Sequence, residues 1–211
     1  MKITKFGHAC LLIEEAGSSI LIDPGAYSSG FEGLTGLAAI LITHVHPDHI
    51  DQDRFAELVH ANPQALLYGD EDTVAELAKR DITIKVSKDG DIFEVRDVKV
   101  EVIGSLHAVI HPSWGQAKNV GYKIADRFFY PGDALTVPEG EIEILAIPAA
   151  APWSKISETV DYLIEVSPKV AIPVHDGFLS RPSLFGQMLG SFAEQAGSKI
   201  QVLENGISIE L

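Results

Sequence analysis

Three histidines and one aspartate lie within six residues of the segment LITHVHPDHID, which begins with the end of an apolar run. Imidazole and carboxylate groups together suit zinc, with iron or manganese as further candidates. A loop that follows a buried strand lets side chains converge on one point above a rigid scaffold. The alternative, a polar loop of hydrogen-bonded histidines, explains such dense ligand chemistry less well. The pattern therefore predicts a metal site that includes His44, His46, Asp48 and His49.

A second segment, GSLHAVIHPSW (residues 104–114), carries two histidines four residues apart. His107 and His111 would share a face only if the segment were helical. An apolar, β-branched run precedes it, and Pro112 biases His111 toward an extended conformation. The segment alone leaves open whether both, one or neither of these histidines binds a ligand.

The elements that must position these residues alternate between strand-rich and helical stretches. Short strands fill the first third and the middle of the chain, and no linker or internal repeat divides residues 1–211. We therefore expect a single domain in which two mixed sheets pack face to face with helices outside. The helices are expected at 53–62, 71–80, 154–168 and 183–197, and a hairpin over 199–211 is expected to turn at Asn205-Gly206.

Composition restricts the class of protein. The formal net charge is −14 and no basic stripe is present, which argues against a nucleic-acid partner held through its phosphates. No run approaches the roughly 18 apolar residues that cross a bilayer, and no secretory signal is visible. The single cysteine, Cys10, excludes an intramolecular disulfide. We expect a soluble, cytoplasmic protein without a membrane partner; the oligomeric state stays open.

The whole chain resembles the metallo-β-lactamase superfamily, whose signature H-x-H-x-D-H is present at residues 44–49. The other matching residues follow in the same order: Asp23 in LIDPG, His107 in SLHA, Asp133 in YPGDAL and His175 in IPVHDG. The resemblance implies a four-layer αββα sandwich. Within the superfamily, FGHACLLIEEAGSSILIDPG and the short chain look like the ascorbate-6-phosphate-lactonase-like metal-dependent hydrolases.

The resemblance also implies two zinc ions, with manganese or iron as alternatives, and a hydroxide between them as the nucleophile. Asp133 would bridge both ions, and Asp23 would support a ligand histidine from behind. Two dications, two carboxylates and one hydroxide leave a site of about +1, so a small, anionic substrate can still enter a negatively charged protein. The implied ligands of the first ion are His44, His46 and His107, and those of the second are Asp48, His49 and His175.

The implied ligand count needs only one histidine from GSLHAVIHPSW. His107 directly follows the expected strand, as His44 and His175 do, and it is the predicted ligand. His111 then becomes a candidate for substrate contact or proton transfer, with a surface-loop histidine as the alternative. Other residues keep open roles: His8 and Trp153 as cleft or structural residues, Lys155 and Arg181 as anion-binding or solvated cations, and Tyr27 as part of a flap.

The predicted activity is hydrolysis of a small ester, lactone or phosphodiester, with Asp48, Asp133, Asp23 and His111 as the residues closest to the chemistry. A nuclease of the same superfamily is an alternative, which the lack of basic patches disfavours. A mononuclear iron oxidoreductase is another, because its ligand types would be the same.

Overall fold

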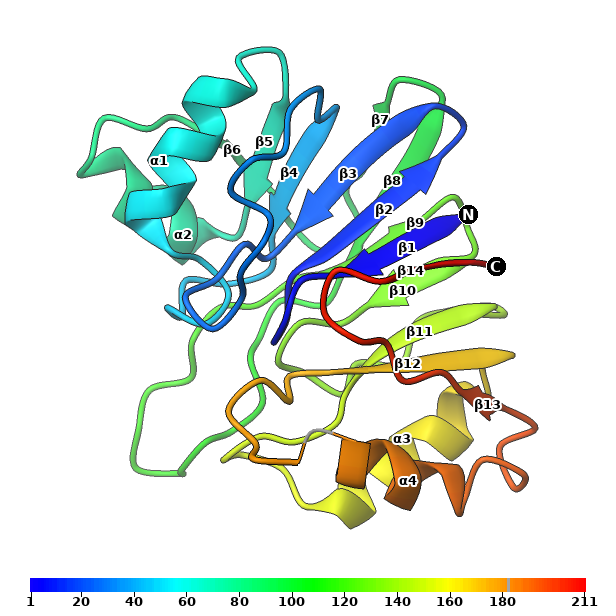
Figure 1. Ribbon diagram of the computed structural model, residues 1–211. Coiled ribbons are helices and arrows are strands. Elements are labelled where there is room, and N and C mark those ends of the chain that lie inside the picture. The colour runs from blue at the N-terminus through cyan, green and yellow to red at the C-terminus, as the bar shows by residue number, and fades with distance from the viewer. Residues whose placement is uncertain (182) are drawn as a thin grey trace.

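The computed structural model describes residues 1–181 and 183–211 and contains two sheets that pack face to face (Figure 1). The first sheet has the order β14-β1-β2-β3-β4-β5-β6 and the second β13-β12-β11-β10-β9-β8-β7. Each is mixed: β1 to β3 and β7 to β10 pair antiparallel, whereas β3 to β6 and β10 to β13 pair parallel. The strands of the first sheet are β1 (Lys2–Lys5), β2 (Leu11–Glu15), β3 (Ser18–Ile22), β4 (Ala39–Ile42), β5 (Leu66–Gly69), β6 (Lys85–Val86) and β14 (Ser208–Glu210). Those of the second are β7 (Ile92–Val95), β8 (Val98–Ile103), β9 (Gly121–Ile124), β10 (Phe128–Tyr130), β11 (Ile144–Pro148), β12 (Val170–Val174) and β13 (Lys199–Ile200).

Alternation along the central strands explains why both faces of each sheet are covered. In β4, Ala39 and Leu41 join the core between the sheets, whereas Ile40 and Ile42 point outward to a second apolar cluster. The same alternation in β11 sends Ile144 inward and Leu145 outward. Strands that bury both faces read as continuous apolar runs, and such strands need a layer of helices on the outer side.

Four helices supply those outer layers. Phe55 of α1 (Gln52–Ala61) and Leu77 of α2 (Glu71–Ala78) pack on the first sheet. Leu163 of α3 (Ile156–Val166) and Leu189 of α4 (Ser183–Gly190) pack on the second. Figure 1 shows the two helix pairs on opposite sides of the sandwich, so the expected αββα architecture is confirmed. Within the described ranges 1–181 and 183–211, no helix has the length and apolarity needed to cross a membrane.

Three local expectations are wrong. The C-terminal hairpin does not form: β13 pairs with β12 and β14 with β1, so the chain passes from one sheet to the other and covers an open edge of each. The helix expected over 183–197 ends at Gly190, and turns follow, because glycine weakens a helix at that point. His107 does not directly follow a strand: β8 ends at Ile103, and a bridge between Leu106 and Lys118 carries the chain onward.

Candidate metal centre

Two groups of potential metal ligands lie at one end of the sandwich. In each group, the ligand atoms lie within 4.8 Å of one another. All seven metal ligands named in the sequence analysis are present, and His8 is added to the second group. They come from loops that follow β1 or β4 in the first sheet and β8, β10 or β12 in the second. The first group is His44, His46, His107 and Asp133; the second is His8, Asp48, His49 and His175.

Asp133 lies between the two groups. Its Oδ1 is 3.1 Å from Nε2 of His49, and its Oδ2 is 3.0 Å from Nε2 of His175 in the second group. The same Oδ2 is 3.4 Å from Nε2 of His107 in the first group. Asp133 is 3 % exposed, so its carboxylate is largely shielded from water. This placement suits the predicted bridging role.

The imidazoles of three histidines are held so that one nitrogen stays available. Nδ1 of His107 lies 2.6 Å from the carbonyl oxygen of Ala108, and Nδ1 of His175 lies 2.6 Å from that of Ala150. A carbonyl only accepts, so each Nδ1 carries the proton and each Nε2 presents a lone pair. Nδ1 of His49 is bound in the same way to a carboxylate oxygen of Asp23, 2.7 Å away.

These free nitrogen atoms are buried without hydrogen bonds. Among residues 1–181 and 183–211, Nε2 of His49, His107 and His175 and Oδ1 of Asp133 have no hydrogen-bond partner. A buried polar atom without a partner costs free energy unless something pairs with it. Three lone pairs and a carboxylate oxygen that converge in this way fit a divalent cation, so the residues present fit the implied metal.

Asp23 supports this arrangement from behind. It is fully buried, and it accepts hydrogen bonds from the backbone nitrogen of Thr43 (2.8 Å) and from its hydroxyl (2.7 Å) in addition to that of His49. Its backbone φ of 49° is strained for a residue other than glycine, as is often seen at functional sites. The turn at Gly25 packs closely against the loop that carries Asp48 and His49. A Cβ on Gly25 would lie 1.8 Å from the carbonyl oxygen of Asp48, so the site needs glycine there.

Burial and neighbouring charges set the protonation of the centre. Burial lowers the pKa of His44 well below its ordinary value, which favours the neutral form that binds metal. Burial also disfavours charge on His49 and His175, but Asp133 raises the pKa of both, in the case of His175 to about 9. Burial opposes the charge on Asp133 too, yet the positive charge of His49 holds its pKa well below the usual range. The centre therefore favours positive charge, as protons or as metal.

A cleft of about 460 Å³ opens from the first group. Its floor includes His46 and His107, and its walls come from residues 108–112 and 114–117. His111 lies on this wall, exposed, with Nδ1 2.8 Å from the hydroxyl of Ser113. Val109 and Trp114 of the same wall are 54 % and 66 % exposed. The wall thus combines apolar side chains with the imidazole of His111 and the amide of Gln116.

The remaining residues with open roles differ in whether they contact the metal centre or line the cleft. The indole Nε1 of Trp153 donates to Oδ2 of Asp133 (2.9 Å), a role beyond the cleft wall considered from the sequence. Lys155 is exposed and, like Arg181, does not line the cleft. Cys10 is fully buried in the outer core of the first sheet, and burial raises the pKa of its thiol, so it is a packing residue. Tyr27 is exposed, with its ring 5.5 Å from that of His8.

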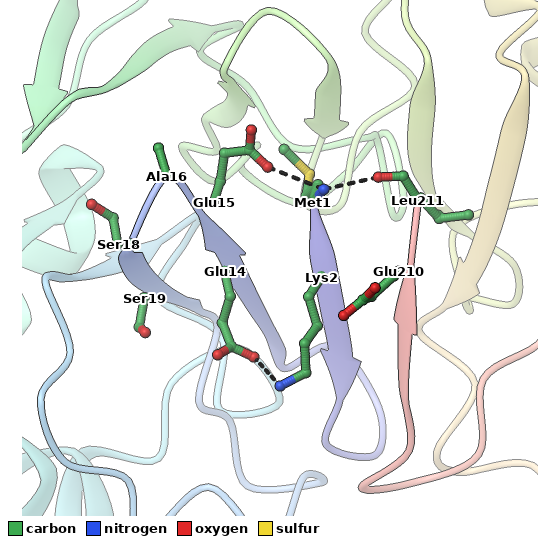
Figure 2. A pocket seen from close by; sticks show the side chains of 10 residues that line it. Met1, Lys2, Glu14, Glu15, Ala16, Ser18, Ser19, Glu210 and Leu211 are labelled. Carbon is green, nitrogen blue, oxygen red and sulfur yellow. Dashed lines mark hydrogen bonds and ion pairs between the residues drawn. The ribbon is translucent and has the colours of Figure 1, made fainter.

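A wider cleft of about 630 Å³ lies elsewhere and carries no metal ligands (Figure 2). It is lined by the outer ends of β1, β2, β3 and β14, whereas His8 and Asp23 follow the opposite ends of β1 and β3. Lys2 pairs with Glu14 there (2.7 Å), and the amino group of Met1 pairs with Glu15 (3.2 Å). Both cations of this cleft are therefore paired with a carboxylate.

Comparison with known proteins shows what this chain is similar to. A family model described as "Beta-lactamase superfamily domain" matches residues 2–175. Protein Rv0786c of Mycobacterium tuberculosis is 45% identical over 208 residues, 96% of either chain. The solved structure of Igni18, a metallo hydrolase from Ignicoccus hospitalis, has a TM-score of 0.73 at 20% identity and covers 100% of this chain and 98% of its own. YhfI from Bacillus subtilis, a metallo-beta-lactamase fold protein, has a TM-score of 0.72 at 14% identity over 99% and 98% of the two chains.

Proposed function

The chain belongs to the beta-lactamase superfamily, and from this premise we propose that it is a metal-dependent hydrolase with a centre for two zinc ions. The observation that carries the proposal is the pair of ligand groups with Asp133 between them. Each group contains the three residues that the sequence resemblance assigns to one ion. The finer relation to the ascorbate-6-phosphate-lactonase-like hydrolases stays a prediction.

The residues divide the work between holding, orienting and bridging. Zinc ions held in this way would supply a hydroxide at neutral pH and polarise the bond under attack. His44, His46 and His107 would hold the first ion, and Asp48, His49 and His175 would hold the second. Asp23 orients His49, and the backbone carbonyls of Ala108 and Ala150 orient His107 and His175. Asp133 lies within 3.4 Å of histidines in both ligand groups and would bridge the two ions. The indole of Trp153 holds one oxygen of Asp133 by a hydrogen bond.

The cleft favours a carbonyl substrate with an apolar group. Its lining includes Val109, Ile110, Pro112 and Trp114 but neither lysine nor arginine. An acyl or aryl group would bury apolar surface there at about 25 cal/mol per Å². Without a cation in the wall, any negative charge of the substrate must be neutralised at the metal ions. We therefore favour an ester or a lactone over a phosphodiester.

A substrate panel on metal-loaded protein tests this proposal. Aryl esters of acetate and hexanoate, a γ-lactone with an alkyl chain and a bis-aryl phosphate diester are compared by kcat/KM, and metal content is measured by elemental analysis. We expect hydrolysis that chelation abolishes, and a higher kcat/KM for the hexanoate than for the acetate ester. Loss of activity in Asp133→Asn, with full activity in His60→Ala, an exposed histidine on α1, would locate the reaction at this centre.

Each alternative gives a different result. A diester hydrolysed faster than every carbonyl substrate overturns the preference for esters and lactones. Cleavage of RNA or DNA at low salt would favour the nuclease. One equivalent of iron with a visible absorption spectrum would favour the oxidoreductase and overturn the two-zinc centre.

A further inference from the structure

His8 stands in the second ligand group by distance but differs from its neighbours in hydrogen bonding. The ring is fully buried, and its centroid lies 4.1 Å from that of His175. Its Nε2 lies 3.3 Å from Oδ2 of Asp48. Distance alone would make it a further ligand for the second ion.

The backbone of Gly177 decides which nitrogen of His8 carries the proton. The amide of Gly177 donates to Nδ1 of His8 over 2.9 Å. An amide N–H only donates, so Nδ1 must accept and cannot carry a proton. A doubly protonated ring would place two donors against each other, so His8 is the neutral imidazole with its proton on Nε2.

The protonated nitrogen of His8 is Nε2, whereas in His49, His107 and His175 it is Nδ1. In those three residues Nδ1 donates to an oxygen, and Nε2 has no hydrogen-bond partner in the part of the chain that the structure describes. In His8 both ring nitrogens are already engaged, Nδ1 as acceptor and Nε2 as donor to Asp48. Neither nitrogen has a lone pair left for a cation.

The backbone around His8 connects the same two segments. The amide of His175 donates to the carbonyl oxygen of His8 (2.8 Å), and the backbone φ of His175 is a strained 61°. A Cβ on Gly177 would lie 2.8 Å from Cβ of His8, so glycine allows the close approach. His8 follows β1 of the first sheet, whereas His175 and Gly177 follow β12 of the second. His8 thus contacts both the turn that carries His175 and the carboxylate of Asp48.

We propose that His8 is a positioning residue and not a ligand: its Nε2–H donates to Asp48 while Gly177 fixes its ring, and together they preorganise the second metal subsite. This proposal rests on the two-ion centre of the proposed function. Groups of this kind behind a ligand typically change metal affinity about 10–100-fold when they are removed.

Metal titration of the full chain separates a positioning residue from a ligand. In His8→Ala, we expect two zinc ions per chain at saturating metal, with the second bound about 10–100-fold more weakly. His8→Gln, whose amide can donate from near the position of Nε2, should recover most of that affinity, whereas His8→Phe, which lacks a donor, should not. His175→Ala, the matched ligand variant, should lose the second ion.

Nitrogen NMR of the zinc-loaded wild type reads the tautomer directly and needs no variant. We expect the Nε2–H form for His8 and the Nδ1–H form for His175. A metal-bound Nε2 on His8, or loss of the second ion from His8→Gln as complete as from His175→Ala, would overturn the proposal. A wild-type protein that binds fewer than two ions would instead contradict the proposed function, so the two failures are distinguishable.

Discussion

His107 and His111 are four residues apart, yet only His107 lies in one of the two ligand groups. His107 is 1 % exposed, with Nδ1 bound to a carbonyl and Nε2 free. His111 is exposed on the cleft wall, and its Nδ1 forms a hydrogen bond with the hydroxyl of Ser113. The difference lies in the fixed partner of each ring, because a buried imidazole whose Nδ1 is occupied can direct only Nε2 to a cation.

Substitution of each residue with alanine tests this contrast. His107→Ala should lose about one equivalent of bound zinc, because a ligand is removed. His111→Ala should keep both ions and lose turnover at most. Elemental analysis after gel filtration measures the metal, and kcat with an ester measures turnover. Equal metal loss in both variants, or loss in His111→Ala alone, would contradict the assignment.

Trp153 acts on the centre through one hydrogen bond. Its Nε1 donates to Asp133 at 2.9 Å, so Trp153→Phe removes a donor from the predicted bridging carboxylate while it keeps most of the ring. We expect unchanged zinc stoichiometry and roughly 10–100-fold weaker binding, measured by competition with a chromogenic chelator. Trp114→Phe is the matched control, because this exposed residue contacts no ligand histidine by ring packing and should leave affinity unchanged.

At the scale of elements, α2 carries a buried carboxylate at its first turn. Asp70 caps the helix by accepting from the backbone nitrogens of Asp72 (3.0 Å) and Thr73 (3.2 Å). Burial raises the pKa of Asp70 to about 6, even though these hydrogen bonds favour the charged form. Between the unfolded value of 3.8 and about 6, the folded state therefore binds more protons than the unfolded state. The free energy of unfolding must fall as pH rises through this range.

Asp70→Asn tests that linkage, because asparagine keeps a capping oxygen and cannot ionise. Relative to wild type, the variant should gain on the order of 2 kcal/mol in the free energy of unfolding between pH 4 and pH 7. Urea unfolding of the metal-free protein at several pH values measures the difference. Glu57→Gln, an exposed change on α1, should show no such trend. Parallel pH profiles for Asp70→Asn and wild type would show that the burial cost is compensated elsewhere.

The sequence indicates most elements but not how the chain closes the sandwich. Strands that are covered on both faces have continuous apolar sequences. The apolar runs at β4 and β11 therefore predict buried strands, and the structure contains them. The Asn205-Gly206 turn is compatible with a hairpin, but two unpaired sheet edges favour β13 and β14 in different sheets. Long-range edge pairing of this kind leaves no local pattern.

The same limit applies to the centre. The motif at residues 44–49 predicts a metal site from its local sequence. The family resemblance adds Asp133 and His175 to the predicted ligands. The hydrogen bonds of Trp153 to Asp133 and of Gly177 to His8 join segments 20 and 169 residues apart. A lone Trp or Gly in the sequence carries no mark of such a contact, so these roles emerge only from the fold.

At the scale of the whole molecule, the two sheets meet in a buried ion pair as well as in apolar contacts. Nζ of Lys5, at the end of β1, lies 2.6 Å from a carboxylate oxygen of Asp176, and it also donates to the carbonyl oxygen of Pro173 in β12 (3.0 Å). Both charged side chains are 4 % exposed. Two buried charges satisfied by each other favour one relative placement of the sheets, since any other leaves a charge unpaired.

The ligand groups extend this connection, because each draws residues from both sheets. The first combines His44 and His46 after β4 with His107 and Asp133 from the second sheet, and the second combines Asp48 and His49 with His175. A cation bound in either group therefore links loops from the two halves of the sandwich. Unfolding must separate these loops, so bound metal has to leave before or during global unfolding.

Metal loading should consequently raise the stability of the entire chain and not only order one loop. Zinc at 100 times its dissociation constant adds about 2.7 kcal/mol per site to the free energy of unfolding, which should raise Tm by several degrees in a chain of this length. Differential scanning calorimetry with and without a chelator measures the shift. His60→Ala should retain it, whereas the double variant His44→Ala and His175→Ala, which lacks one ligand from each group, should show little. An equal shift in the double variant would mean that zinc stabilises the fold from outside this centre.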